Sequence, residues 1–182
     1  MEQRNIKISS EKRYATDLGE IEYSDRQIIN KQITGCGYTS KVILETPKCI
    51  IISPSRNFII NKLKEKRFED INLIGVYQED KGGASNTDII AGTSDCNFCI
   101  LVTPESFERA LQNINCCNLD EVELWIDEYH RFSQDYVFRN DGIRNVIDNL
   151  HLFKKVRLLS ATPISESYVL DCFKDFDILN LE

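Results

Sequence analysis

Two adjacent carboxylates follow a short apolar run in the segment VELWIDEYHRF. Asp127 and Glu128 come directly after Trp125 and Ile126, and His130 lies two residues further on. Burying two carboxylates in an apolar core is costly, so a strand that ends in them should end at the edge of a sheet. Ligands of open parallel sheets bind at that edge, where one carboxylate can hold Mg²⁺ and its neighbour can activate an attacking water. An ordinary acidic loop after a strand has the same local composition, so this segment alone leaves both interpretations open.

The glycine-containing segment ITGCGYTSK has the composition of a phosphate-binding loop. Gly35 and Gly37 permit a turn in which several backbone N–H groups face one anion at the start of a helix. Thr39, with Ser40 behind it, can offer a hydroxyl group to Mg²⁺. The sequence therefore predicts a phosphate-binding turn that is followed directly by a helix.

The position before this hydroxyl normally carries a lysine, and here it carries Tyr38, which cannot offer a positive charge. Lys41 is a candidate replacement, since it is three residues further on and so on the same helical face, and helical side chains lean toward the N-terminus. Otherwise the loop binds phosphate through backbone amides and Mg²⁺ alone, or the site is degenerate. The residues expected to form the phosphate site are Gly35, Cys36 (a small filler), Gly37, Tyr38, Thr39, Ser40 and Lys41.

Seven short apolar runs alternate with amphipathic segments, which is typical of βαβ units around a parallel sheet. The runs are rich in β-branched residues and almost continuously apolar, as strands covered on both faces are. Strands are predicted within residues 27–34, 48–53, 71–77, 97–103, 122–127, 155–160 and 176–182. Helices are predicted within residues 39–45, 54–68, 104–114 and 138–153, and the polar segment 78–95 is expected to be a surface connection with at most a short helix. The predicted fold class is α/β, with a mostly parallel sheet of about seven strands and helices on both faces.

The composition fits one domain and excludes few functions. A chain of 182 residues buries roughly 70 % of its unfolded surface. The net charge of −7 argues against a small module dedicated to DNA binding, but it allows contacts through a local basic patch or backbone amides. No apolar run approaches the ~20 residues of a membrane span, and the charged start of the chain is unlike a signal peptide.

The cysteines indicate a reducing environment rather than a metal site. Seven scattered cysteines favour reduced thiols and a cytoplasmic location. Cys96 with Cys99, and the adjacent Cys116 and Cys117, are possible zinc ligands. Together they do not form the two C-x₂-C pairs of a standard zinc site, and Cys99 falls within a predicted buried strand, so zinc is not favoured.

Five segments in a fixed order resemble the N-terminal RecA-like lobe of superfamily 2 helicases of the DEAD/DEAH-box type. They are GCGYTS, SPSRNFIINKL (motif Ia), LVTPESF (motif Ib), DEYH (motif II) and SATP (motif III). The resemblance covers about residues 30–165 and implies a RecA-like P-loop NTPase domain. We expect this lobe to occupy residues 23–182 and the polar segment 1–22 to be frayed.

The resemblance implies ATP and Mg²⁺ as ligands and assigns roles to the residues at the acidic strand end. Asp127 would coordinate Mg²⁺ together with Thr39, and Glu128 would polarise the hydrolytic water. His130 would sense the γ-phosphate and touch an opposite, second lobe. The chain would then act as the ATP-binding half of a helicase or nucleic acid translocase.

The resemblance implies that the remaining motif residues bind nucleic acid or couple it to the nucleotide site. Ser160 and Thr162 would couple the nucleotide site to the nucleic acid surface. Arg56, Thr103 and Glu105 would contribute to holding the sugar-phosphate backbone of DNA or RNA, between which the motifs do not distinguish.

Three departures from the family pattern qualify this expectation. The loop lysine is replaced, and no convincing upstream glutamine motif for adenine is present, although Gln27 or Gln32 could serve. The chain has no second RecA-like lobe, which in these motors supplies an arginine finger worth roughly 10³–10⁵ in rate. We therefore expect little or no ATP hydrolysis by the chain alone. The alternative is a non-catalytic adaptor that binds nucleotide or nucleic acid through a degenerate loop.

Overall fold

One parallel sheet of eight strands organises the chain, for which the computed structural model describes residues 2–6, 14–95, 97–115, 118–135, 140–162 and 169–181. The order of the strands is β1-β8-β2-β7-β6-β3-β5-β4, and every described pairing is parallel. The strands are β1 (Gln3–Ile6), β2 (Arg26–Asn30), β3 (Lys48–Ile52), β4 (Leu73–Val76), β5 (Phe98–Val102), β6 (Glu123–Asp127), β7 (Lys155–Ser160) and β8 (Asp177–Leu181).

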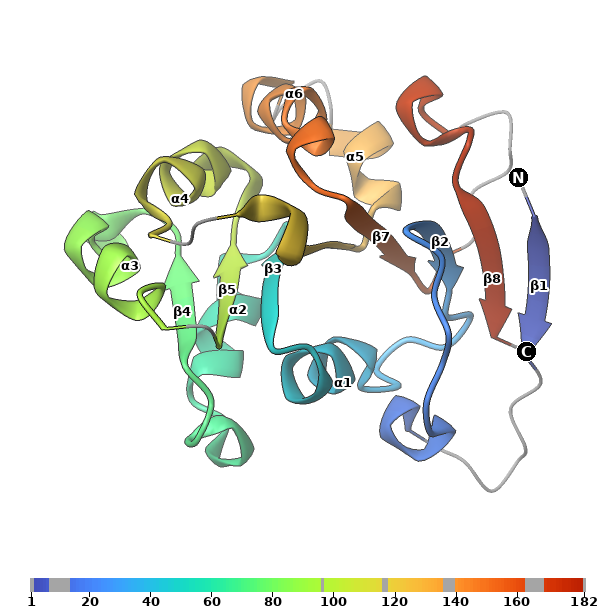
Figure 1. Ribbon diagram of the computed structural model, residues 1–182, viewed down its shortest axis with the longest axis horizontal. Coiled ribbons are helices and arrows are strands. Elements are labelled where there is room, and N and C mark those ends of the chain that lie inside the picture. The colour runs from blue at the N-terminus through green and yellow to red at the C-terminus, as the bar shows by residue number, and fades with distance from the viewer. Residues whose placement is uncertain are drawn as a thin grey trace.

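Helices cover both faces of the sheet. They are α1 (Tyr38–Glu45), α2 (Arg56–Leu63), α3 (Asn86–Gly92), α4 (Phe107–Asn113), α5 (His130–Asp135) and α6 (Asn140–Asp148). Short 3₁₀ turns occur at Ala15–Leu18, Lys66–Phe68, Glu79–Lys81, Pro104–Ser106, Leu119–Glu121, Leu150–Leu152 and Asp171–Phe173. The helices α1 and α2 lie on one face, and α3, α4, α5 and α6 lie on the other (Figure 1).

The two apolar cores follow from the alternation of side chains along each strand. In β3, Ile50 and Ile52 join the core under α4 and α6, whereas Cys49 and Ile51 face α1 and α2. All five residues of β5 are buried, as expected for a strand covered on both faces. The near-continuous apolar runs of the sequence therefore mark the central strands.

The parallel arrangement brings the carboxyl ends of the central strands to one edge of the sheet. The last residues of β2 and β7 are register partners, Asn30 with Ser160, and Asp127 of β6 lies beside Leu159 of β7. These three neighbouring strands are far apart in sequence, so the edge collects residues from three separate segments. This edge carries the candidate site.

The predicted fold is confirmed, with one additional helix, α5, and one additional strand, β1. Each of the seven predicted runs contains a strand, and all four predicted helical segments contain a helix. The polar segment 78–95 forms the short helix α3, and α5 follows β6 directly, where no helix was predicted. The expectation that the whole N-terminal segment is frayed is not met, because Gln3–Ile6 pairs with β8 as an edge strand. Such a strand is fixed mainly by backbone hydrogen bonds, which leave no apolar pattern in the sequence.

Candidate functional site

The pair of carboxylates lies at the sheet edge, directly after the buried part of β6. Asp127 is the last residue of β6 and is 4 % exposed. Glu128 follows with a positive φ of 54°, and its backbone N–H donates to Asp127 Oδ1 over 3.1 Å. Among the described residues, Glu128 and Gln32 alone combine a positive φ with a side chain, and both lie just beyond the end of a central strand. Backbone strain of this kind is concentrated at functional sites.

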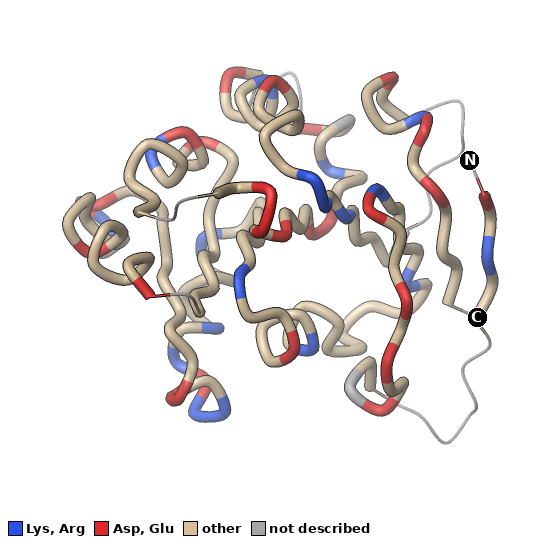
Figure 2. Tube along the Cα trace, viewed as in Figure 1, with Lys and Arg blue, Asp and Glu red and all other residues tan. Residues whose placement is uncertain are grey.

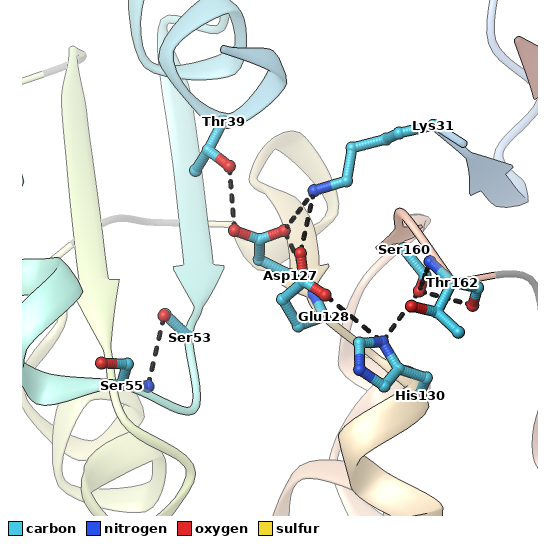
Figure 3. A network of polar contacts seen from close by, with 9 residues as sticks. All are labelled: Lys31, Thr39, Ser53, Ser55, Asp127, Glu128, His130, Ser160 and Thr162. Carbon is cyan, nitrogen blue, oxygen red and sulfur yellow. Dashed lines mark hydrogen bonds and ion pairs between the residues drawn. The ribbon is translucent and has the colours of Figure 1, made fainter. Parts of the chain in front are cut away.

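The glycine turn and the start of α1 meet Asp127 from the opposite side. Gly35 and Gly37 both adopt positive φ, 71° and 75°, and Gly37 is the N-cap of α1. A glycine takes this conformation without steric cost, which explains the two glycines of the motif. The Thr39 hydroxyl donates to Asp127 Oδ2 over 2.9 Å, so the predicted metal ligands are in contact (Figure 3).

A lysine that the sequence motifs do not include lies at the centre of this site. Lys31 directly follows β2, and its Nζ atom is 2.9 Å from Asp127 Oδ1 and 3.3 Å from Glu128 Oε1 (Figure 3). Its side chain is 8 % exposed. Burial alone lowers the pKa of a lysine, but here the two carboxylates outweigh burial and the pKa of Lys31 is raised. The available sequence signal was a cation placed directly after an apolar strand that must end at the same edge as the two acids.

The side chain of Tyr38 leaves the loop and enters the core. Its ring is 1 % exposed, packs beside Trp125, and its hydroxyl lies 2.5 Å from the hydroxyl of Tyr23. Burial, together with the neighbouring Tyr23, raises the pKa of Tyr38 well above its ordinary value. Tyr38 is therefore a neutral core residue that contributes only its backbone to the loop.

The expectation that Lys41 reaches back to the phosphate loop is not met. Its Nζ atom donates to Gly19 O over 2.9 Å and to Glu45 Oε1 over 2.7 Å. Glu45 lies one helical turn further toward the C-terminus, so the ammonium group is directed away from Gly37. Glu45, at i,i+4 spacing, therefore gives the Lys41 ammonium group a carboxylate partner.

A chain of polar contacts joins the acidic strand end to the end of β7. His130 Nδ1 lies 3.3 Å from Glu128 Oε2 and 2.8 Å from Ser160 Oγ. Ser160 Oγ donates to the Thr162 carbonyl over 2.8 Å and accepts from the Thr162 N–H over 3.0 Å. The Ser160 carbonyl also accepts the backbone N–H of Lys31 over 2.7 Å. The structure thus brings His130, Ser160 and Thr162 together with both carboxylates (Figure 3).

We call the cavity between the glycine turn and the acids the loop pocket. Its volume is about 250 Å³, and it is lined by Tyr14, Lys31, Gly35, Cys36, Gly37, Tyr38, Thr39, Ser40, Phe58, Lys62, Arg67, Asp127 and Glu128. Lys62 and Arg67 both donate to Ser40 Oγ over 2.9 Å and share Glu65 as a counterion. Figure 2 shows a local cluster of basic residues at and after the end of α2. Two of them, Lys62 and Arg67, line the loop pocket.

A second cavity, the outer pocket, lies at the ends of β3, β4 and β5. Its volume is about 520 Å³, and its lining is Pro54, Ser55, Arg56, Asn57, Tyr77, Gln78, Thr103, Glu105 and Arg131. Arg56, Glu105 and Arg131 are exposed there, whereas Thr103 is buried. The predicted nucleic acid residues Arg56, Thr103 and Glu105 therefore line one cavity, and Arg131 joins them from α5.

The structure separates the other candidates from these pockets or leaves them undescribed. Gln27 is buried within β2 and Gln32 is exposed beyond it. Cys99 is buried in β5 beside Cys49 of β3, and Cys96, Cys116 and Cys117 lie outside the described residues. Within the described part of the chain, no group of three or more His, Cys, Asp or Glu residues is placed to hold a metal ion.

The chemistry of the loop pocket suits a metal-bound polyphosphate. Thr39 and Asp127 offer hard oxygen atoms, which Mg²⁺ prefers, and Mg²⁺ is commonly bound through one or two carboxylates plus substrate phosphates. The helix N-terminus and the turn amides favour an anion at the same place.

The sequence matches the DEAD/DEAH box helicase family over residues 27–169. The chain belongs to this family. The match spans the loop, the acidic strand end and the SAT segment, so the motifs that suggested the resemblance all fall inside it. No curated protein matches the sequence.

Three solved structures share the fold at low identity. The DEAD-box helicase Mss116, solved with ssRNA and UDP-BeF, has a TM-score of 0.61 at 15 % identity, over 93 % of this chain and 38 % of its own. A DEAD box protein from Methanococcus jannaschii has a TM-score of 0.59 at 18 % identity, over 88 % and 46 %. A hypothetical ATP-dependent RNA helicase from Sulfolobus tokodaii has a TM-score of 0.57 at 17 % identity, over 91 % and 54 %. The chain thus spans about half or less of the length of these proteins.

Among the described residues of the chain, no helix is long and apolar enough to cross a membrane.

Proposed function

We propose that this chain is the first, nucleotide-binding lobe of an ATP-dependent nucleic acid motor that hydrolyses ATP when a second RecA-like lobe closes on it. The observation that carries the proposal is the contact of the Thr39 hydroxyl with Asp127, next to Glu128, at the N-terminus of α1. A family member that never hydrolysed ATP would have no need of both acids in this arrangement.

Each group in the loop pocket has a chemical task under this proposal. The turn amides after Gly35 and the start of α1 bind the phosphates. Thr39 and Asp127 would hold Mg²⁺, which when bound neutralises charge on the phosphate oxygens. Glu128, which is only partly buried, accepts a proton from the attacking water. The exposed ring of Tyr14, beside Gly37, offers a surface on which a base can stack.

The outer pocket is proposed as the place of the nucleic acid backbone. Arg56 of α2 and Arg131 of α5 are exposed cations that line this pocket, and arginine is well suited to phosphate. The structural neighbour Mss116 is described with single-stranded RNA bound, which makes a single strand the first ligand to test. The hydrogen bonds that connect His130 to Ser160 and Ser160 to Thr162 would transmit the state of the nucleotide site toward this surface.

A second function, that of a non-catalytic adaptor, is favoured by one observation. The lysine position of the loop holds Tyr38, whose ring is committed to the core and cannot take part in turnover. In that case the loop pocket would bind nucleotide, or the outer pocket nucleic acid, without hydrolysis.

The deciding experiment is an ATPase assay on the longest natural protein that contains this chain and a second RecA-like lobe. Phosphate release would be measured with Mg²⁺, with and without single-stranded DNA or RNA. Hydrolysis that rises on addition of nucleic acid supports the motor. ATP binding by calorimetry without hydrolysis under any of these conditions would overturn the motor and support the adaptor.

A further inference from the structure

The loop pocket needs a cation that its sequence motif does not provide. Asp127 and Glu128 are adjacent carboxylates, and a bound nucleoside triphosphate would add further negative charge beside them. Tyr38 is neutral and buried, and the Lys41 ammonium is held by Gly19 and Glu45 away from the pocket. The loop itself therefore supplies no positive side chain.

Three other cations line the pocket, and they differ in what they contact. Lys62 and Arg67 converge on Ser40, the third residue of α1, and are balanced by Glu65. Lys31 instead reaches the two carboxylates themselves, 2.9 Å from Asp127 and 3.3 Å from Glu128. Lys31 is thus the cation that shares Asp127 with Thr39, on the side where the metal-bound end of a polyphosphate would lie.

The backbone around Lys31 is held in one place. Its N–H donates to Ser160 O over 2.7 Å, which extends the β2–β7 pairing by one residue. The next residue, Gln32, has a positive φ of 56°, so the chain turns sharply directly after Lys31. Together these features fix the direction of the lysine side chain, as a functional position requires.

A purely stabilising role explains this arrangement poorly. Taking a lysine out of water is costly, and a buried ion pair is on average no more stabilising than an apolar pair of the same volume. A lysine retained at 8 % exposure, next to a glycine turn and a helix N-terminus, is better explained by a ligand.

We propose that Lys31 supplies, from the end of β2, the positive charge that the loop lacks at residue 38, and that it contacts the terminal phosphates of the bound nucleotide. In the free protein its ammonium group rests on Asp127 and Glu128. When nucleotide binds, the same group turns to the phosphates without leaving the pocket. The inference rests on the proposed nucleotide binding and adds the residue that makes it possible without the usual lysine.

The test compares nucleotide affinities of the unchanged chain, Lys31→Met, Lys31→Arg and Lys41→Met. Methionine keeps the alkyl stem and removes the charge, and Lys41→Met is the matched control because Lys41 is the other buried lysine of the described residues. ATP and ADP would be titrated by calorimetry, once with Mg²⁺ and once with EDTA, after thermal unfolding has shown that each variant is folded.

We expect Lys31→Met to weaken ATP binding by about 10- to 100-fold, with and without Mg²⁺, because it removes a charge-assisted contact. ADP binding should weaken less, Lys31→Arg should restore most of the ATP affinity, and Lys41→Met should stay within about twofold of the unchanged chain.

Two results would overturn the inference alone: ATP binding that is not weakened, and a loss that occurs only with Mg²⁺. If the Lys31→Met variant bound ATP as tightly as the unchanged chain, Lys31 would not contact the phosphates. If it bound ATP more tightly, Lys31 would instead compete with Mg²⁺ for the carboxylates. The loss could also occur only with Mg²⁺, which would mean that Lys31 merely orders the acids for the metal. If the unchanged chain bound neither ATP nor ADP, the proposed nucleotide binding would fall as well, so the two failures are distinguishable.

Discussion

The loop pocket and the outer pocket lie at the same edge of one sheet, yet they are built differently. In the loop pocket, Lys31, Thr39 and Asp127 are almost fully buried and are tied to one another by short polar contacts. In the outer pocket, Arg56 and Arg131 are exposed on the surface. The loop pocket is also the smaller, about 250 Å³ against about 520 Å³.

The difference corresponds to what each pocket would have to do. Chemistry on a phosphate depends on groups fixed at the reacting atoms, and buried dipoles and charges act strongly because water does not screen them. A sugar-phosphate backbone is flexible and repetitive, so long exposed cationic side chains can bind it, mostly through electrostatic attraction that salt screens. Substitutions should therefore have steep effects in the loop pocket and graded, salt-dependent effects in the outer pocket.

The largest effect is expected for Glu128→Gln, tested in a protein that contains this chain and a second RecA-like lobe. Glutamine has the same shape but cannot accept a proton, so ATP turnover should fall by about 10²- to 10⁴-fold while ATP binding persists. Phosphate release and calorimetry measure the two quantities. Turnover within a few-fold of the unchanged protein would show that Glu128 is not the base.

A smaller effect is expected in the outer pocket for Arg56→Ala and Arg131→Ala. Each should weaken binding of a single-stranded oligonucleotide by roughly 3- to 10-fold at low salt, and each should reduce the slope of log affinity against log salt by about 0.7. Fluorescence anisotropy over a series of salt concentrations gives both numbers.

The control for this experiment is Lys154→Ala, an exposed lysine that pairs with Asp25 away from the outer pocket. It should leave affinity and salt slope unchanged. An equal loss for Lys154→Ala would mean that binding follows net charge and that the outer pocket has no special role.

Tyr38→Phe tests whether the loop pocket is anchored by the core beneath it. The substitution removes the hydroxyl contact with Tyr23 and should lower the free energy of unfolding by about 1 kcal/mol. Nucleotide affinity should stay within about twofold, because the ring of Tyr38 is buried beside Trp125 and its hydroxyl contacts Tyr23. Urea unfolding and calorimetry check the two parts, and a large loss of affinity without loss of stability would contradict the assignment of Tyr38 to the core.

The smallest effect is expected for Lys41→Ala. Its ammonium group contacts Gly19 and Glu45, so ATP affinity should change by less than about twofold. A clear loss of affinity in a folded variant would restore Lys41 as the replacement for the loop lysine.

Much of the fold could be predicted because the central strands are buried on both faces. The runs around Ile50, Ile100 and Ile126 are almost continuously apolar, and such runs have few other places in a folded protein. The edge strand β1 and the helix α5 could not be predicted in the same way. β1 is fixed by backbone pairing with β8, and α5 starts at His130, within the polar DEYH motif, which has no helical apolar pattern.

The family, the order of the strands along the chain and the acids at the end of β6 follow from the sequence. Local patterns carry that information, since apolar runs and strand-end polar residues are visible one segment at a time. Which lysine meets the acids depends instead on long-range packing. Lys31 and Asp127 are 96 residues apart, and they meet because β7 lies between β2 and β6 with all three carboxyl ends at one edge. Lys41 directly follows the glycine motif in the sequence, but its ammonium group is turned away by a glutamate one helical turn further along.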